Sequence, residues 1–146
     1  DFHILIVRPA VQMGIHAFTP SYVSTSIHDL NDLVPLRSLT ESGVPVAFGS
    51  DNLPPSLFHP MWHASARKSR GGQVVGESQA IHRSHALEIA TQGGAYLCFD
   101  EDKRGRLAPG FLADWSLLTA DPLSCAEEEL PHIQATKVMV NGQFVL

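Results

Sequence analysis

The sequence is poor in cysteine, has no long apolar run and carries no excess of basic residues. Its two cysteines, Cys98 and Cys125, are too few for a fold held by several disulfides, although a single bridge between them stays open. No apolar run approaches the roughly 18–20 residues of a membrane-spanning helix. We therefore expect neither a small disulfide-rich domain nor a membrane partner.

The charge balance of the chain is acidic. Ten Lys and Arg residues stand against 15 Asp and Glu residues, which gives a formal net charge of −5 over 146 residues. Domains that bind nucleic acids usually show a basic stripe, so we expect no nucleic-acid partner. With 44% hydrophobic and 17% charged residues, the composition is that of an ordinary globular protein.

The start of the sequence is unusual. It opens at Asp1 instead of Met and enters the apolar residues 4–7 almost at once. It lacks a basic segment followed by an apolar stretch and a small-residue cleavage site, which is the pattern of a secretory signal peptide. We expect a cytoplasmic protein whose N-terminus lies upstream of this sequence.

The pattern of apolar residues predicts strands near both ends of the chain and helices between them. Residues 30–39 carry a leucine at every third position, which predicts a short helix that is capped by Asp29 and ends at Gly43. Asn141-Gly142 lies between two alternating runs, the strongest local sign of a β-hairpin. The other predicted strands are residues 3–12, 44–48, 113–119, 135–140 and 143–146, and the other predicted helices are residues 56–70 and a segment that is capped by Ser78 or Ser84 and reaches Ala95.

An acidic residue follows the most apolar of these predicted strands. Residues 44–48 lack polar alternation, as expected of a strand buried on both faces in a parallel α/β sheet. Asp51 lies just past the end of this strand, where barrels and open α/β sheets carry their catalytic residues. A carboxylate there could bind a metal ion and accept a proton from a metal-bound water. The alternative is a structural turn or helix cap, because Asp-Asn before Pro-Pro is ordinary turn composition.

The eight histidines raise the question of a metal site. His59 and His63 are four positions apart and His82 and His85 are three apart, and both spacings share one face of a helix. However, Pro60 stands where the metalloprotease motif His-Glu-x-x-His has its glutamate. We therefore interpret both pairs as surface or helix-capping residues.

Other local patterns favour structural roles. Residues 67–70 hold three cations near the end of a predicted helix, where positive charge complements the helix dipole. Neither Gly71-Gly72 nor Gly93-Gly94 has the spacing of a phosphate-binding loop. Ser50 lies in Gly-Ser-Asp and not in Gly-x-Ser-x-Gly, which disfavours a small serine hydrolase.

Five segments, taken in order, resemble one enzyme family. Residues 43–51 resemble its last barrel strand, an apolar strand that ends in Ser-Asp, and residues 85–95 resemble the helix after it. Residues 105–115 match the motif Gly-x-Leu-x-Pro-Gly-x-x-Ala-Asp, and residues 121–123 and 136–143 complete the pattern. On these segments the chain resembles the C-terminal portion of a metal-dependent amidohydrolase, most closely the amidohydrolase-3, YtcJ-like branch of that superfamily.

The resemblance implies an α/β fold class with two parts. Residues 1–104 would be the C-terminal part of a (β/α)8 TIM barrel, its last strands and helices. Within them, residues 15–22 resemble the seventh barrel strand. Residues 105–146 would supply the C-terminal strands of a composite, urease-like β-sandwich.

The resemblance also implies a site. Asp51 would be a metal ligand that handles the proton of the nucleophilic water, and His3, near the place of the family's sixth-strand histidine, is a second candidate ligand. Asn52, Leu53 and Pro54 would line the pocket mouth, because barrels bind substrates with the loops that follow their strands. The implied cofactor is a divalent metal ion, zinc, and the implied substrate is a small amide-type molecule whose non-peptide C–N bond is hydrolysed.

The sequence departs from the family in the ligands that it lacks. The His-x-His pair, the bridging lysine or acidic ligand and the fifth-strand histidine have no counterpart. We therefore expect that this chain alone does not retain the metal and is inactive, and that the N-terminal part of the barrel is its partner. Exposed barrel edges would also favour self-association. The alternative is a truncated or degenerate, non-catalytic module with a binding or structural role.

Overall fold

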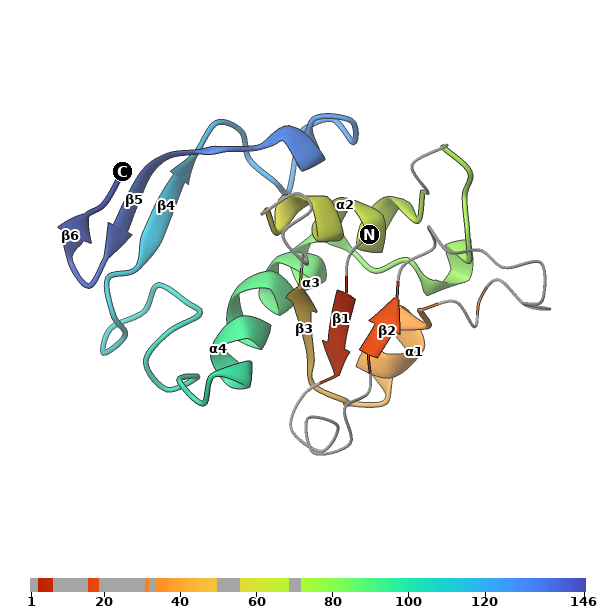
Figure 1. Cartoon of the computed structure of the whole chain (residues 1–146), viewed down its shortest axis with the longest axis horizontal. Helices are drawn as coiled ribbons and strands as arrows, with labels where there is room; N and C mark the ends of the chain where they lie inside the picture. The colour runs from red at the N-terminus through yellow and green to blue at the C-terminus, as the bar shows by residue number, and fades with distance from the viewer. Residues whose placement is uncertain (1–2, 7–15, 19–30, 32–33, 50–55, 69–71) are drawn as a thin grey trace.

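The computed structural model describes residues 3–6, 16–18, 31, 34–49, 56–68 and 72–146 (Figure 1). This part of the chain forms two three-stranded sheets and a group of short helices. The first sheet has the strand order β2-β1-β3, with β1 at His3–Ile6, β2 at His16–Phe18 and β3 at Val46–Gly49. The second has the order β4-β5-β6, with β4 at Trp115–Leu118, β5 at Ala135–Val140 and β6 at Gln143–Phe144. The mixture of helices and strands confirms the predicted α/β content.

The first sheet is antiparallel around its central strand. β1 pairs with β2 on one side and with β3 on the other, both in antiparallel register, so β2 and β3 run parallel to each other. The prediction of parallel neighbours is therefore wrong for β1. Residues 7–15, which connect β1 to β2, are too few for the crossover of roughly a dozen or more residues that a parallel pair needs.

β3 is buried on both faces, as its apolar sequence predicts. Val46, Ala47 and Phe48 are 6%, 0% and 7% exposed, and the helical residues 89–97 pack against the strand. Such burial depends on what covers the two faces of a sheet and not on the direction of the neighbouring strand. The apolar pattern therefore located the strand without specifying its partner.

The helices lie around the first sheet. α1 spans Leu36–Glu41 and α2 spans Phe58–Ala66. A longer helix over residues 83–97 consists of α3 (Arg83–Glu88), the π turn η4 (Ile89–Gly93) and α4 (Gly94–Leu97). There are also two 3-10 turns in the described part of the chain, η3 (Glu77–Gln79) and η5 (Leu130–His132). In the described part of the chain, none of these helices is long and apolar enough to cross a membrane.

Two helices begin at other residues than predicted. α1 has Pro35 as its N-cap instead of Asp29, because a proline in the helix interior would remove a hydrogen bond and clash with the preceding turn. α3 has His82 as its N-cap, and the His82 side chain accepts a hydrogen bond from the backbone N–H of Ser84. Neither Ser78 nor Ser84 is the cap, since the imidazole nitrogen of His82 already supplies the acceptor.

The helix over residues 83–97 approaches β3 at a glycine. A Cβ atom at Gly93 would lie 2.3 Å from the carbonyl oxygen of Val46 and 3.1 Å from Cα of Ala47. No side chain fits there, so glycine allows the helix and the strand to pack backbone against backbone. The next residue, Gly94, would place its Cβ in open space.

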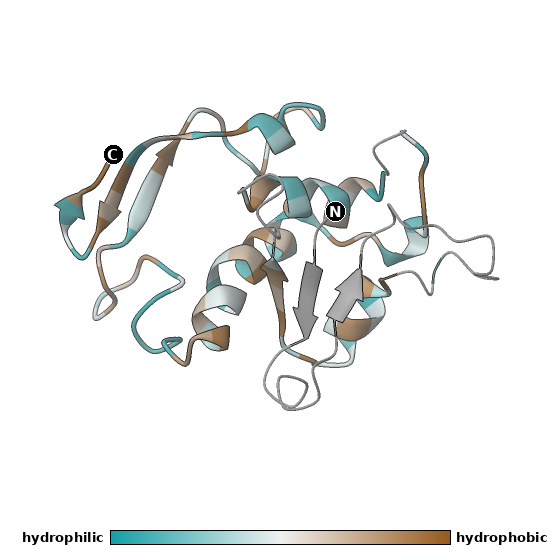
Figure 2. Ribbon diagram, in the orientation of Figure 1, coloured by the Kyte–Doolittle hydropathy of each residue, from teal (hydrophilic) through white to brown (hydrophobic). Residues whose placement is uncertain are grey.

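The second sheet contains the predicted hairpin. β5 and β6 pair across Asn141 and Gly142, which have φ angles of 50° and 74°, as a type I′ turn requires. The backbone N–H of Asn141 donates to Oδ1 of Asp114 at 2.6 Å, which ties the turn to the residue before β4. Hydrophobic residues lie along β3 and β5, whereas β6 is hydrophilic in colour (Figure 2).

Residues 119–134, which connect β4 to β5, pack on the helices of the first half of the chain. Leu130 and Ile133 are 0% and 4% exposed and belong to the same buried cluster as Met61 and Ala64 of α2. Within the described residues, one hydrophobic core thus includes side chains from both parts of the chain. The predicted boundary after residue 104 stays a prediction.

The two cysteines are free thiols, so the bridge that their number left open does not form. Cys98 is exposed after the end of α4, whereas Cys125 is half-buried in the segment between β4 and β5. Nη1 of Arg83 donates to the carbonyl oxygen of Cys125 at 2.6 Å. This bond adds a polar contact between α3 and the connecting segment.

We predict that Gly93→Ala destabilises the fold, whereas Gly94→Ala does not. A methyl group at position 93 would collide with the backbone of Val46, and overpacking of this kind typically costs about 1–3 kcal/mol. Position 94 has room and a helical φ of −64°, so alanine there should add about 0.5–1 kcal/mol of stability. Free energies of unfolding in urea measure both effects, and equal stabilities would contradict the contact between this helix and β3.

Candidate functional site

The candidate site is the edge of the first sheet at which β2 and β3 end. Because these strands run parallel, their C-terminal ends lie at the same edge of the sheet (Figure 1). The segment after β2 leads to α1 and the segment after β3 leads to α2. Asp51, Asn52, Leu53 and Pro54, which were predicted to act here, lie outside the described residues and follow Gly49 by two to five positions.

His3 is the predicted ligand whose backbone the structure places. It pairs with Gly49, so β1 brings position 3 beside the end of β3. The structure does not describe its side chain. The expected placement on a sixth, parallel barrel strand is wrong for β1, which runs antiparallel to β3. His3 nevertheless pairs with the last residue of β3, and Asp51 follows that residue by two positions in the sequence.

α2, the first helix after β3, carries three neighbouring aromatic rings. The ring centroids of His59 and His63 are 4.8 Å apart, and those of Trp62 and His63 are 4.7 Å apart. The spacing of the two histidines therefore does place them on one helix face, as predicted. His63 is only 1% exposed, so its interpretation as a surface residue is wrong.

The buried ring of His63 is held by the backbone beyond its own helix. Its Nδ1 is 2.7 Å from the carbonyl oxygen of Lys68. A carbonyl oxygen only accepts, so Nδ1 is the donor of this hydrogen bond. Through this bond His63 acts as a cap for the turn that ends α2, which is the other role predicted for it.

Arg67 ends α2 and is the largest fully buried side chain in the described part of the chain. Its backbone is left-handed, with φ 53° and ψ 32°, and its exposure is 1%. Nε donates to the carbonyl oxygen of Val75 at 3.0 Å, and Nη1 donates to that of Val34 at 3.1 Å. Burial lowers the pKa of this guanidinium. Arg67 lies at the helix end, as predicted, but its donors are directed to carbonyl groups of two other segments.

Both carbonyl partners of Arg67 belong to irregular backbone. Val34 has a φ of 55°, a conformation that costs about 1–3 kcal/mol and is rare for β-branched residues. Its carbonyl oxygen also accepts from the N–H of Leu36 at 2.7 Å. Val75 is fully buried, and its N–H donates to the carbonyl oxygen of Arg67 at 2.8 Å, so these two residues share two hydrogen bonds.

Lys68 joins the end of α2 to the segment between β4 and β5. Its Nζ forms an ion pair with Glu127. The hydrogen bond and the charge of Glu127 raise the pKa of Lys68 above its usual value. Lys68 also forms an isolated antiparallel bridge with Val74. The residues that end α2 thus contact three other segments of the chain.

The described residues do not by themselves fit a metal centre. Among them, no group of three or more His, Cys, Asp or Glu side chains could hold a metal ion. His59 and His63 supply two nitrogen donors on one helix face, whereas a closed zinc site has about four ligands. Asp51 and the side chain of His3, the predicted ligands, lie outside the described part.

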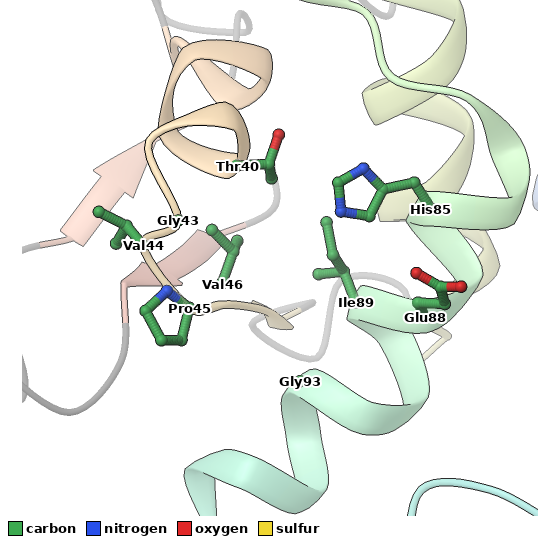
Figure 3. Close-up of a pocket in the computed structure, with 9 residues that line it drawn as sticks. All are labelled: Thr40, Gly43, Val44, Pro45, Val46, His85, Glu88, Ile89 and Gly93. Atoms are coloured by element: carbon green, nitrogen blue, oxygen red, sulfur yellow. The ribbon is translucent and has the colours of Figure 1, made fainter.

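A pocket of about 230 Å³ lies at the opposite end of β3 (Figure 3). It is lined by Pro45 and Val46 at the start of the strand, by Thr40 of α1 and by His85 and Glu88 of α3. Barrel enzymes place their catalytic groups at the C-terminal ends of the strands, and the N-terminal ends serve stability. We therefore do not take this pocket as the candidate site.

Comparison with known proteins identifies the family. Residues 1–146 match the family model described as "Amidohydrolase family", and the chain belongs to this family. It is 31% identical over 113 residues to N-substituted formamide deformylase of Arthrobacter pascens, an alignment that covers 75% of this chain and 21% of that protein. It is 30% identical over 115 residues to the putative amidohydrolase YtcJ of Bacillus subtilis (strain 168), with 75% and 22% covered. The chain thus spans about a fifth of the length of these curated relatives. No solved structure gives a significant match.

The family match confirms the resemblance that the five sequence segments predicted. It also places the chain in a superfamily that is generally metal-dependent. The identity of the metal and the roles of individual residues stay predictions.

We predict that Glu127→Gln lowers the pKa of Lys68 toward its usual value. The carboxylate of Glu127 is the first cause of the raised pKa, through a hydrogen bond and through its charge. Because the folded-state pKa is raised, the ion pair stabilises the fold fully below pH 10.5 and loses this effect as the pH rises through the folded-state pKa. NMR titration of the Lys68 ammonium measures the shift, with the exposed Glu129→Gln as the control. A wild-type Lys68 that titrates at its usual pKa would contradict the ion pair.

Proposed function

We propose that this chain forms part of the active site of a metal-dependent hydrolase that cleaves non-peptide, amide-type C–N bonds, and that the site lies at the C-terminal end of β3. The observation that carries the proposal is the buried strand β3, which ends at Gly49 two positions before Asp51. Membership of the amidohydrolase family supports it.

Amide hydrolysis needs a base for the attacking water and an acid for the departing nitrogen. In the proposed reaction, the carboxylate of Asp51 accepts a proton as the water oxygen bonds to the carbonyl carbon. The same proton then passes to the nitrogen as the C–N bond breaks, so the products are a carboxylic acid and an amine. A carboxylate at the end of a buried strand suits this task, because the strand fixes where the chain enters the site.

A divalent metal ion, for which we propose zinc, would when bound polarise the substrate carbonyl and lower the pKa of water. Asp51 and His3 are the ligands that this chain would offer. The pairing of His3 with Gly49 supports the inclusion of His3, since it brings position 3 beside the end of β3. Asn52, Leu53 and Pro54 follow Asp51 and would line the mouth of the pocket.

We further propose that the remaining ligands come from the rest of the whole protein, in the N-terminal part of a (β/α)8 barrel. Residues 1–104 would complete that barrel with its last strands and helices, and residues 105–146 would be the C-terminal strands of a β-sandwich. The sequence lacks the His-x-His pair and the bridging ligand, which supports this division of the site. The small-molecule substrate would be of the amide type, and N-substituted formamides are suitable probes in view of one relative's name.

We predict that Asp51→Asn lowers the turnover of amide substrates by the whole protein about 10²- to 10⁴-fold, the usual contribution of a general base. Hydrolysis of a panel of N-substituted formamides and other simple amides measures this, with the metal content determined in parallel. Asp102→Asn is the matched control, because Asp102 is exposed and lies far along the chain from β3.

The 146-residue chain alone provides the second arm of this test. We expect it to hydrolyse no amide and to bind zinc no more tightly than the micromolar range. If the Asp51→Asn variant of the whole protein kept full activity, Asp51 would not be the general base. A whole protein that binds no metal and hydrolyses no amide would favour the non-catalytic module instead.

We predict that the isolated chain self-associates through exposed apolar surface. Leu117 and Phe144 are 53% and 61% exposed, and the strand register places both on one face of the second sheet. Uncovered apolar sheet faces and strand edges recruit partners. Light scattering at high concentration should give a mass above the monomer, which Leu117→Lys reduces and Leu123→Lys, at an exposed turn position, does not. A monomer at all concentrations is the opposing result.

A further inference from the structure

The pocket at the start of β3 brings two polar side chains together outside the proposed active site. Its volume is about 230 Å³, and it lies between α1 and the helix over residues 83–97 (Figure 3). His85 and Glu88 are three positions apart on α3, so they share one helix face, and both line the pocket. In the part of the chain that the structure describes, neither side chain has a hydrogen bond or an ion pair. Both groups are therefore available to a ligand.

Across the pocket, Thr40 of α1 offers a further hydrogen-bond acceptor. Its Oγ1 donates its proton to the carbonyl oxygen of Arg37 at 2.9 Å, so toward the pocket the hydroxyl oxygen can only accept. A carboxylate likewise only accepts, and a neutral imidazole has one acceptor nitrogen. Figure 3 shows Thr40 on one side of the pocket and His85 and Glu88 on the other. A ligand between them thus meets acceptors from two helices.

The backbone over residues 43–45, which also lines the pocket, supplies no donor to balance these acceptors. The N–H of Gly43 donates to the carbonyl oxygen of Thr40 at 3.1 Å, and that of Val44 donates to the carbonyl oxygen of Leu39 at 3.3 Å. Pro45 has no N–H. An anion would need donors here, whereas a cation that donates hydrogen bonds matches the lining. A protonated primary amine is such a group, because it carries three N–H donors and no acceptor.

The rest of the lining is apolar. Val46 and Ile89 are 6% and 5% exposed, and Pro45 lines the pocket with them (Figure 3). The carbon chain of an amine can pack on these side chains while its ammonium group meets the acceptors. At about 230 Å³ the pocket is smaller than the roughly 300–1,000 Å³ of sites for drug-sized ligands. Its occupant is therefore a small molecule with a short carbon chain.

The arginines of the neighbouring pocket are directed to partners of their own. That pocket, of about 300 Å³, shares the start of β3 with the first and is lined by Arg104 and Arg106. Arg104 forms ion pairs with Asp100 and Asp114, at 3.6 and 3.4 Å. The guanidinium of Arg106 lies 5.2 Å from the centre of an aromatic ring. Glu88 has no such partner among the described residues, so its carboxylate is available to attract a cation.

We propose that the pocket at the start of β3 is a binding site for a small primary alkylammonium ion. Glu88 provides the opposite charge, and His85 and Thr40 accept the remaining N–H donors. The carbon chain packs on Val46 and Ile89. This site is separate from the proposed active site, which lies at the other end of β3, and binding does not depend on the proposed reaction. An amine is nevertheless the class of product that the proposed hydrolysis releases.

The first test is a titration of the whole protein with n-propylammonium chloride, followed by NMR of labelled methyl groups. We expect a saturable shift of the Val46 and Ile89 methyl signals, with a dissociation constant in the millimolar range. The methyl signals of Leu123, which is exposed between β4 and β5, should not shift. The absence of a saturable shift at Val46 and Ile89 would overturn the proposal.

Three related probes separate the charge of the ligand from its hydrogen bonds. Tetramethylammonium has the charge but no N–H donor, 1-propanol has the carbon chain without the charge, and propionate has the opposite charge. We expect each of them to bind about fivefold more weakly than n-propylammonium or worse, because hydrogen bonds to charged groups are the stronger ones. If any of the three bound as tightly as n-propylammonium, the site would not be specific for a primary ammonium group.

The second test compares two variants that remove the same charge. Glu88→Gln keeps the size of the side chain, and we expect it to weaken n-propylammonium binding about fivefold or more. Glu41→Gln is the matched control, because Glu41 is exposed beside Thr40 on α1 and does not line the pocket. Its effect should stay below about twofold, as for other screened surface charges. Equal effects of the two variants would show attraction by surface charge alone and would overturn the site. Urea unfolding checks that both variants keep the fold.

Amide hydrolysis by the whole protein shows whether the two sites are separate. We expect Glu88→Gln to leave kcat/KM unchanged, because Glu88 lies at the opposite end of β3 from the proposed reaction. A loss of turnover together with the loss of binding would place the pocket in the active site and contradict a separate site. A wild type that hydrolyses no amide would contradict the proposed function, and the binding data would still decide whether the pocket takes an ammonium ion.

Discussion

The close contact between β3 and the helix over residues 83–97 is the constraint on which the rest of the structure depends. At Gly93 the helix meets the backbone of Val46 with no side chain between them. This contact helps to bury β3, and the buried strand in turn fixes the position of Gly49, which precedes Asp51 by two positions in the sequence. A bulkier residue at position 93 would move the helix outward and open the core around Phe48 and Ile89. The position of the candidate site is thus set by packing on the far side of the strand.

Polar bonds add to the apolar contacts of this core. Around the end of α2, the side chains of His63, Arg67 and Lys68 each bond to a group outside the helix. Two of them satisfy carbonyl groups in irregular backbone, which have no partner in a helix or sheet. Lys68 is half-buried and contributes through a weaker, solvent-screened ion pair. The end of α2 therefore carries the deeply buried charge of Arg67 and the charge of Lys68, whose ion pair is weakened by salt and by high pH.

The parts of the fold that depend on neighbours in the sequence were predictable. Asn141-Gly142 specified its turn, and the apolar residues 44–48 specified a buried strand, because local conformation and burial are encoded in a few adjacent positions. Strand direction and the role of Arg67 were not predictable, since they depend on segments up to dozens of positions away. A charged residue near a helix end has the same sequence pattern whether it faces solvent or the core. For the site, the sequence and the family identify Asp51 as the candidate, and the structure adds the strand before it and the helix after it.

Leu130 and Ile133 reach back from the segment between the strands of the second sheet into the core beside α2. Unfolding that segment, for example by proteolytic cleavage, would remove two apolar side chains from the helix that carries His63 and Arg67. The C-terminal sheet and the α2 region should therefore respond to heat and denaturant as one cooperative unit. This packing also limits the exchange of the C-terminal sheet during evolution, because a replacement would need apolar side chains that pack on α2 as Leu130 and Ile133 do.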